Sequence, residues 1–412
     1  MGGGLMQLVA YGAQDIYLTG NPQITFFKVV YRRHTNFSME AIEQTINGSV
    51  SVGSSVSSTI SRNGDLISRL WLETDVTVDA ASVSHTVALG AAGQKNNIGY
   101  AMLKNVELEI GGQLIDRQSG EWMTVYDQLT NDQYVQMLQV ADTVASANYD
   151  EAALRYVPNS YQSMIGGFVH LAAAAPYTFL VPLHFWFCRN PGLALPLIAL
   201  QYHEVKVKID LRTNDVNQQT LSALGLKLWA DYIYLDTDER RRFAQVSHEY
   251  LIEQVQVQSS TGPNATEKKF DLNFNHPVKE LIWTASASIT PTEFLSQHAV
   301  GTSATNVDSG SAQLKLNGHD RFASRDLQYF TRCQPYQHHT NVPPCGMIGV
   351  YSFALKPEEH QPSGTCNFSR IDNAQLSITP STDLSSATVN IYAVNYNVLR
   401  IMSGMGGLAY SN

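Results

Sequence analysis

The sequence has 412 residues, of which 44% are hydrophobic and 15% are charged, and its length predicts two domains that each bury a core. The charged fraction is well below the usual figure of about 25%, so most of the surface is expected to be neutral and hydrogen-bonding. A balance of 36 acids against 27 bases argues against a protein that binds nucleic-acid phosphates directly.

The cysteines and the apolar runs narrow the class further. Four dispersed cysteines do not form a disulfide framework, and we expect reduced, mostly buried thiols at Cys188, Cys333, Cys345 and Cys366. The first six residues show neither a secretory signal nor a myristoylation pattern. Prolines interrupt the longest apolar runs, so no membrane span is expected. An intracellular, soluble protein is predicted.

Residues 1–23 are predicted to form an N-terminal arm. Their apolar residues give a partly amphipathic pattern that ends at Asn21-Pro22, and both a docking arm and a frayed terminus fit it. Residues 25–37 (TFFKVVYRRHTNF) follow, with an apolar run capped by basic residues. We interpret this run as the opening strand of the first sheet domain.

Alternating strand patterns dominate the rest of the chain. In residues 202–211, for example, Val205, Val207 and Ile209 share one face, while Lys206 and Lys208 share the other. Many short strands at such spacing are typical of β-sandwiches. The predicted strands lie at 59–78, 105–110, 202–211, 270–274, 280–285, 313–316, 347–355, 374–378 and 388–394.

Helical patterns are confined to an insertion. Residues 131–140 and 150–155 are predicted to be short helices in a long loop that runs to about residue 177. Loops of this length in a compact domain are usually functional or exposed.

A weak internal repeat divides the chain. The strand and glycine turn at 108–112 (LEIGG) is echoed at 314–318 (LKLNG), and the strand at 231–236 (DYIYLD) is echoed at 390–395 (NIYAVN). Echoes of this length also arise by chance in β-rich sequences, so the pattern alone leaves duplication open. The polar stretch 237–248 is the expected boundary between the halves.

Two groups of residues have the composition of a chemical site but not its spacing. The segment 333–345 holds Cys333, His338, His339 and Cys345, yet no recurring zinc-ligand pattern fits it, so we interpret it as a proline-rich loop. His203 and the neighbouring Glu204 alternate along an extended segment and therefore point to opposite sides. Core or interface placement is expected for them.

The remaining candidates also favour structural roles. Residues 404–407 (GMGG) are interpreted as a tight turn, and Glu107 with Glu109 as a polar sheet face. Residues 240–242 (RRR) follow three acids and are interpreted as a local ion-pair cluster at the domain junction. No nucleophile motif or cofactor fingerprint is present in the sequence. We therefore predict no enzyme activity, with no catalytic, cofactor-binding or metal-binding residues.

Four stretches carry a family resemblance. Residues 361–372 (QPSGTCNFSRID) lead into the alternating strand 373–379 (NAQLSIT), and residues 25–37, 191–206 (PGLALPLIALQYHEVK) and 397–412 (NVLRIMSGMGGLAYSN) agree with it. Together they resemble the major capsid proteins of large icosahedral double-stranded DNA viruses, and they look closest to the chlorella-virus type. In the first stretch, 362–364 reads as a turn, and Arg370 with Asp372 is expected to pair locally or across a subunit boundary.

The resemblance implies an all-β fold of two tandem eight-stranded antiparallel jelly-roll β-sandwiches, with short helices in inserted loops. The expected organisation is an N-terminal arm at 1–23 and a first jelly-roll domain at 24–236. A linker at 237–248 and a second jelly-roll domain at 249–412 follow.

The resemblance also implies partners and a location. Three chains are expected to form a homotrimer, a pseudo-hexagonal capsomer that tiles the outer capsid shell of the virion against neighbouring capsomers, with minor capsid proteins beneath. Assembly in the host cell cytoplasm is implied. Covalent glycans made by viral enzymes are implied too, at positions outside the usual sequon. The formal sequons at Asn36, Asn47, Asn264 and Asn367 are interpreted as chance matches.

Two alternatives stay open from the sequence. A minor or vertex capsid paralogue would need the same sandwich cores. A carbohydrate-binding β-sandwich would place aromatic residues on exposed loops, whereas most Tyr and Phe residues here lie inside strand patterns.

Overall fold

The computed structural model describes most of the chain in two compact units, Met1–Phe37 and Ser38–Asn412. The first unit contains two short helices, α1 (Gly3–Val9) and α2 (Ile16–Thr19), with the apolar side chains of Leu8 and Leu18 exposed within it. The described residues are 3–10, 12–23, 29, 31–78, 98–131, 138–141, 154–157, 161, 164–166, 176–212, 221–263, 266–287, 310–343, 348–380 and 387–410.

The predicted opening strand is displaced along the sequence. Residues 31–36 form no strand, and the first strand, β1, begins at Phe37 and ends at Gln44. The predicted opening strand, the apolar run 26–31, is therefore wrong at Val29 and Tyr31, while Phe26, Phe27 and Val30 lie outside the described residues. An apolar, β-branched run favours a strand but does not identify a strand to pair with.

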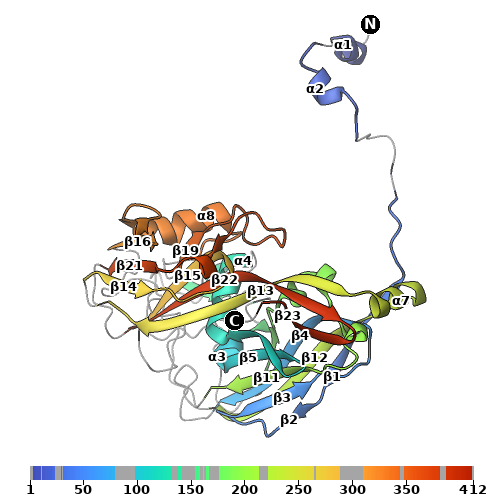
Figure 1. Ribbon diagram of the computed structural model, residues 1–412, viewed down its shortest axis with the longest axis vertical. Coiled ribbons are helices and arrows are strands. Elements are labelled where there is room, and N and C mark those ends of the chain that lie inside the picture. The colour runs from blue at the N-terminus through green and yellow to red at the C-terminus, as the bar shows by residue number, and fades with distance from the viewer. Residues whose placement is uncertain are drawn as a thin grey trace. The chain divides into compact units, whose positions relative to one another are not determined.

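The first sandwich is built from two antiparallel sheets (Figure 1). One sheet has the order β1-β12-β4-β10, with β9 also on β4, and the other has the order β2-β3-β11-β5-β6. Strands β9 and β10 pair with successive parts of β4 and so occupy one strand position. The remaining bounds are β2 Ile46–Asn47, β3 Ser55–Thr59, β4 Leu66–Val78, β5 Leu103–Ile110, β6 Gln113–Ser119, β9 Pro176–Pro182, β10 Leu195–Pro196, β11 Val205–Leu211 and β12 Leu221–Leu235.

The second sandwich repeats this plan. One sheet has the order β13-β22-β15-β19, with β20 on β15 and β23 on β22, and the other has the order β14-β21-β16-β17, with β18 on β16. Its strands are β13 His248–Thr261, β14 Lys268–Asp271, β15 Pro277–Ala287, β16 Gly310–Leu316, β17 His319–Asp320, β18 Arg325–Asp326, β19 Ile348–Ser352, β20 Cys366–Asn367, β21 Ala374–Pro380, β22 Ala387–Met402 and β23 Met405–Leu408.

The two sandwiches match strand for strand. When β9 with β10, β17 with β18 and β19 with β20 are each counted once, and the short β2 and β23 are set aside, each sandwich has eight antiparallel strand positions among the described residues, in two packed sheets, which is the arrangement of a jelly roll. The echoed strands β5 and β16 occupy equivalent positions, and so do β12 and β22. The alternation predicted for β11 is observed, because Val205, Val207 and Ile209 are buried in the core.

The helices differ most from the prediction. Residues 138–141 and 154–157 pair as an antiparallel hairpin of β7 (Leu138–Ala141) and β8 (Leu154–Val157), so the helices expected at 131–140 and 150–155 are wrong where the chain is described. The β-branched and aromatic residues Val140, Tyr156 and Val157 in these segments are types favoured in strands. The helices of the second unit are α3 Ile98–Ala101, α4 Gly120–Thr130, α6 Trp186–Arg189, η4 Pro191–Leu193, η5 Leu197–Ala199, α7 Thr237–Gln245, η6 Tyr329–Cys333, α8 Gln334–His338 and η8 Phe368–Arg370.

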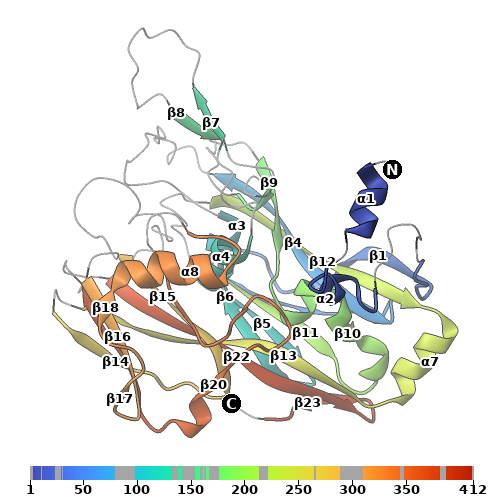
Figure 2. The ribbon, with the colours of Figure 1, turned by 90° about the horizontal axis from the view of Figure 1, so that it is seen from above.

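Helices α4 and α7 occupy different places in the second unit. Figure 2 shows α4 among strands of both sandwiches and α7 at one end of the unit. Helix α7 covers the predicted boundary, and its Phe243 packs against Leu66 and Ile233 at one end of the first sandwich.

The cysteines and the membrane prediction can be checked where the chain is described. Cys188, Cys333 and Cys366 are free thiols, and Cys345 lies outside the described residues. Cys333 is exposed, so the expectation of mostly buried thiols is wrong at this position, which lies on the outward side of η6. Burial raises the pKa of Cys188 to about 12. Among the described residues, no helix has the length and apolar character to cross a membrane.

Candidate functional site: the seam between the sandwiches

The two sandwiches pack against each other along one contact region, called the seam here. In its first half, helix α4 of the first sandwich lies on a sheet of the second. The Ser119 side chain accepts a hydrogen bond from the Trp122 N–H and caps the helix. Trp122, Val125 and Leu129 then share one helical face because their spacing is three and four residues. They form one buried cluster with Ile282, Ile348, Val350, Tyr392 and Val394 from β15, β19 and β22.

The opposite side of α4 is fixed within the first sandwich. Asp127 lies 3.0 Å from the His184 ring nitrogen and accepts a 2.7 Å hydrogen bond from the Tyr161 hydroxyl. The Tyr100 hydroxyl lies 2.9 Å from the same His184 nitrogen. The Tyr126 ring packs on His184 and carries the Arg189 guanidinium 4.3 Å above its centroid. Helix α4 is therefore buried on both sides and joins the two sandwiches.

The second half of the seam runs the other way. Ile252 of β13 and Leu399 and Ile401 of β22 are buried in the core of the first sandwich, although both strands belong to a sheet of the second. The hairpin that β22 forms with β23 is tied there by His203, whose Nδ1 lies 2.9 Å from the Gly406 carbonyl oxygen. Each sandwich thus contributes a segment to the packing of the other.

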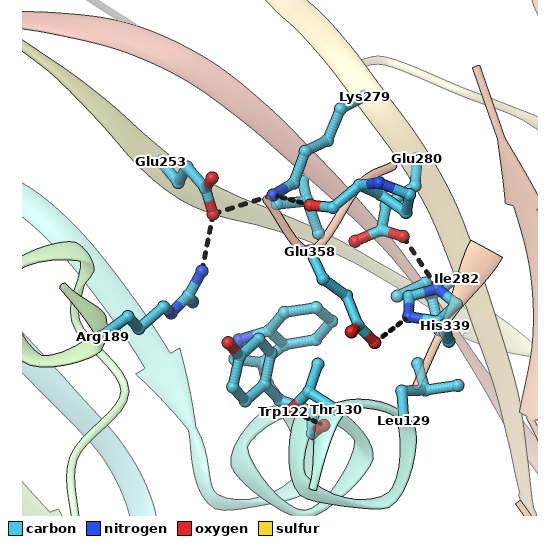
Figure 3. Close-up of a pocket in the computed structure, with 13 residues that line it drawn as sticks. Trp122, Leu129, Thr130, Arg189, Glu253, Lys279, Glu280, Ile282, His339 and Glu358 are labelled. Atoms are coloured by element: carbon cyan, nitrogen blue, oxygen red, sulfur yellow. Dashed lines mark hydrogen bonds and ion pairs between the residues drawn. The ribbon is translucent and has the colours of Figure 1, made fainter. Parts of the chain in front are cut away.

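A buried series of ion pairs crosses the seam (Figure 3). Arg189 of α6 lies 2.6 Å from a Glu253 oxygen of β13, and the Lys279 Nζ lies 2.8 Å from the same oxygen. Lys279 also donates to the Pro357 carbonyl at 2.6 Å, so this buried ammonium has two partners. A buried charge that lost its partner would be strongly destabilising.

A second series of ion pairs is centred on the buried side chain of His339. Its ring nitrogens lie 3.1 Å from Glu280 and 3.0 Å from Glu358 (Figure 3). Burial opposes protonation of this imidazole, but the two carboxylates outweigh burial and raise the pKa of His339 to about 9. Burial likewise opposes ionisation of Glu280, and His339 outweighs it and lowers the pKa of that carboxyl. The pair is therefore ionised at neutral pH.

The small pocket between these two sets of ion pairs has little free space. Trp122, Leu129 and Val394 line it together with the charged side chains, and about one water molecule fits inside. This volume is far below that of a site for a small organic ligand. The seam is suited to holding two sandwiches in a fixed orientation rather than to converting a substrate.

Two histidines of the segment 333–345, which has the residue types of a zinc site, have other partners in the structure. His339 is taken up by the two glutamates, and His338 lies 3.1 Å from the Leu355 carbonyl oxygen through Nδ1. Among the described residues, no three His, Cys, Asp or Glu side chains are arranged to hold a metal ion.

His203 and Glu204 are separated as expected. His203 faces the C-terminal hairpin, and Glu204 pairs with Lys206 at 3.6 Å. Glu107 and Glu109 share the polar sheet face, where they pair with Arg117 and Lys208.

The basic trio forms an ion pair, but with a different acid from those nearby in sequence. Arg240 lies 2.8 Å from Asp65, a buried residue just before β4, while Asp236 caps α7 by accepting from the Thr237 N–H. The glycine turn is also present, because Gly404 has φ +81° and a Cβ there would meet the Tyr202 ring. Sequence spacing could not have identified Asp65 as the partner.

The signature stretch 361–372 serves as a connection between sheets. Gly364 has φ +150°, and a Cβ at this position would lie 2.6 Å from the Phe353 carbonyl oxygen, so glycine is required there. The chain then enters β20 and η8, where the Asn367 side chain caps by accepting from the Ser369 N–H. Arg370 and Asp372 are exposed in the single chain.

The seam residues themselves were not predicted. Arg189, Glu253, Lys279 and Glu280 come from three separate strands or helices, and nothing in their spacing brings them together. The only local signal was at α4, where Ser119 precedes Glu121 and a run of large apolar residues, as at a helix N-terminus.

Comparisons with known proteins agree along the whole chain. Residues 25–236 match a family model described as major capsid protein N-terminus, and residues 239–407 match one described as large eukaryotic DNA virus major capsid protein. The major capsid protein of Pyramimonas orientalis virus is 51% identical, and that of Paramecium bursaria Chlorella virus 1 is 45% identical, each over all of both chains.

A solved structure agrees with the sequence matches. A chain of the capsid of the virus PBCV-1 superposes with a TM-score of 0.77 at 40% identity, covering 94% of this chain and all of that one. Because both halves of the sequence and both sandwiches match, the chain belongs to the large eukaryotic DNA virus major capsid protein family and is a structural component of the virion capsid rather than an enzyme.

Proposed function

We propose that this chain is the principal shell subunit and that three copies close into one capsomer of six sandwiches. The observation that supports this is the seam, in which a helix of one sandwich packs on a sheet of an equivalent sandwich. Such a contact joins two different surfaces, and heterologous contacts that close on themselves form rings. A ring of six equivalent blocks has the edges that a flat hexagonal lattice needs.

The solution mass of the purified chain tests the trimer directly. Light scattering after size exclusion, at moderate salt and micromolar concentration, is expected to give three times the 45.5 kDa chain mass. A clean monomer would contradict the closed trimer. A monomer that also bound a glycan would favour the carbohydrate-binding alternative, and low abundance in purified virions would favour a minor or vertex paralogue.

Within the subunit we propose an arm at residues 1–23, jelly-roll domains at 24–236 and 249–412, and a linker at 237–248. The limits of the two family matches support this division. The exposed apolar side chains of α1 and α2 suit an arm that meets minor capsid proteins beneath the shell. Removal of residues 1–23 is expected to leave the trimer intact and to reduce incorporation into virions.

We also propose that the chain is glycosylated and that shells assemble in the host cytoplasm. Asn36 and Asn47 are exposed, but the resemblance places glycans outside such sequons, so no position is assigned. The intact mass of the chain from purified virions tests the modification, because a value equal to the 45.5 kDa polypeptide would exclude it. Immunogold labelling of infected cells tests the compartment.

A further inference from the structure

Strand β6 of the first sandwich contacts strand β13 of the second at a buried point of the seam. The Gln254 side chain of β13 donates to the Ile115 carbonyl of β6, and the Val255 N–H donates to the Asp116 carboxylate over 3.3 Å. Asp116 is 3% exposed, and its neighbour on β5, Leu108, is buried and apolar. A carboxylate therefore lies between the two sandwiches, away from bulk water.

Among the residues that the structure describes, this carboxylate has no ion pair. Asp116 and Arg117 point to opposite faces of β6, and the Arg117 side chain pairs with Glu107. The cation that faces Asp116 is Arg189 of α6, which lies 2.6 Å from Glu253. An ionised carboxylate that is buried without a cation of its own is costly, because the protein interior replaces its hydration poorly.

Gln118, two residues further along β6, shows that the site also lacks a hydrogen-bond donor. Its amide nitrogen donates to Asp116 Oδ2 and to the His184 carbonyl oxygen, each over 2.9 Å. Because a carbonyl oxygen can only accept, the amide cannot be turned around to present its oxygen to His184. The Gln118 Oε1 is buried and has no hydrogen-bond partner in the described part of the chain. Two buried acceptor groups therefore lie together with one proton too few between them.

A proton taken up from solution satisfies both groups. The neutral Asp116 carboxyl carries an O–H that can donate to the adjacent Gln118 oxygen, and it removes a charge from a buried site. Its other oxygen still accepts from the Val255 N–H, so the link to the second sandwich is kept. Burial is the largest cause that raises the pKa of Asp116, to about 6.

We propose that Asp116 and Gln118 form a proton-binding site of the seam, so that mild acid strengthens the contact between the two sandwiches and neutral pH weakens it. The pKa of Asp116 is raised above its ordinary value of 3.8, so the folded chain binds this proton more readily than the unfolded chain. The stability that the group contributes is therefore complete below about pH 4 and is lost as pH rises through about 6. The site belongs to the single chain and does not depend on the trimer.

The pH range of this site differs from that of the buried histidine. The contribution of His339 is complete below about pH 6.5, because its pKa is raised to about 9. The pKa of Glu280 is lowered, so that carboxyl stays ionised well below the range in which Asp116 titrates. Of these three seam groups, Asp116 is the one whose charge changes around pH 6.

The experiment compares Asp116→Asn with the unmodified full chain by equilibrium urea unfolding at pH 7.5 and at pH 5. Asparagine is uncharged at both values and so imitates the protonated acid. The unfolding equilibrium constant of the unmodified chain, divided by that of the variant, is expected to be about tenfold larger at pH 7.5 than at pH 5. A constant effect of the substitution on packing cancels in this comparison. A ratio that does not change with pH would overturn the proposal.

The matched control is a second buried aspartate that has its own cation. Asp65 is also 3% exposed, but Arg240 lies 2.8 Å from it and the Leu235 N–H donates to it. Asp65→Asn is expected to unfold more easily at both pH values, without the tenfold change in the ratio. The same pH dependence in Asp65→Asn as in Asp116→Asn would mean that the site at Asp116 is not special, and would overturn the assignment.

Infrared difference spectroscopy detects the proton in the folded chain. Acidification from pH 7.5 to pH 5 is expected to give the unmodified chain a protonated-carboxyl band that Asp65→Asn keeps and Asp116→Asn lacks. Gln118→Met, which removes the acceptor, is expected to shift this band, and it tests the site even if Asp116→Asn does not fold. Identical spectra of the unmodified chain and Gln118→Met would show that the proton does not lie between Asp116 and Gln118.

Discussion

The β13-β22-β15-β19 sheet of the second sandwich has an outer face covered by α4, whereas the matching β1-β12-β4-β10 sheet of the first has an outer face with Trp71, Trp229 and Glu73, called the open face here. The two faces share a strand order but differ in chemistry. On the covered face, Ile282, Val350 and Tyr392 are buried against α4, and the acids nearby are buried with their partners. On the open face, Trp71 and Trp229 are half-buried, and Glu73 pairs with the partly exposed Lys227. Equivalent strands therefore do not carry equivalent residues, and the face that α4 covers is the one whose central side chains are apolar and buried.

The strongest way to break this comparison is to remove the buried tryptophan of the seam. Trp122→Ala deletes a fully buried ring from the cluster beneath α4 and leaves a cavity, so the free energy of unfolding is expected to fall by about 3–5 kcal/mol. Urea denaturation followed by circular dichroism measures it. Trp229→Ala on the open face is the matched control, with an expected loss below about 1.5 kcal/mol for the monomer. Equal losses would contradict the distinction between the faces.

The contributions of the ion pairs on the two faces to the free energy of unfolding should differ almost as much. Glu253→Gln leaves Arg189 and Lys279 without their shared carboxylate in a buried site, and the expected destabilisation is about 3 kcal/mol. Glu73→Gln removes the partner of Lys227 at the surface and is expected to cost about 0–1 kcal/mol. Thermal denaturation of both variants at one pH compares them. A small loss for Glu253→Gln would mean that water reaches this pair.

The pH dependence of the seam sharpens the comparison. Because the folded pKa of His339 is about 9, above the ordinary 6.5, its contribution is complete below about pH 6.5 and is lost as pH rises through 9. Glu280 has a lowered pKa, so its contribution is lost only as pH falls through that lowered value. The stability difference between the unmodified chain and His339→Gln is expected to shrink by up to about 3 kcal/mol between pH 6.5 and 9.5.

The control for this titration is the neighbouring histidine. His338→Gln removes an imidazole whose hydrogen-bond contact among the described residues is the Leu355 carbonyl, so this variant should retain the pH dependence of the unmodified chain. Denaturant midpoints across the range measure both variants. A pH-independent difference for His339→Gln would show that its buried ion pairs do not govern the seam.

The smallest expected contrast is between two strand glycines. A Cβ at Gly349 of β19 would lie 2.3 Å from the Trp283 ring, so Gly349→Ala is expected to cost about 1–2 kcal/mol through overpacking. At Gly225 of β12, the nearest atom to such a Cβ is the Asp75 Cβ at 3.3 Å, and Gly225→Ala is expected to be within about 0.5 kcal/mol of neutral. Melting temperatures rank the two. The opposite ranking would contradict the tight packing inside the second sandwich.

The sequence predicted the strands where one face is buried and the other is wet. Strand β11 was predicted because Val205, Val207 and Ile209 alternate with polar residues. This period-two pattern can be read from the segment itself and does not depend on which strands it pairs with. Helix α4 was missed for the converse reason. Buried on both sides, it carries apolar or paired residues around most of its circumference and so lacks an amphipathic pattern.

The seam could be predicted even less. Arg189, Glu253 and Lys279 meet only after two sandwiches have packed, and each would read as a surface charge in its own segment. His339 stood beside His338 in a stretch with the residue types of a zinc site, yet its partners Glu280 and Glu358 are contributed by β15 and a distant loop. Such contacts depend on tertiary packing, which local periodicity does not record.

The crossing of β22 into the first sandwich has a consequence for the order of folding during synthesis. Leu399 and Ile401 complete a core whose other strands are mostly translated much earlier. The contact of His203 with the Gly406 carbonyl can form only after the β22-β23 hairpin has been translated. The first sandwich therefore leaves part of its interior unfilled until the second has been made. A ribosome that stops early would release a chain with an exposed core, open to proteolysis before it could be built into a shell.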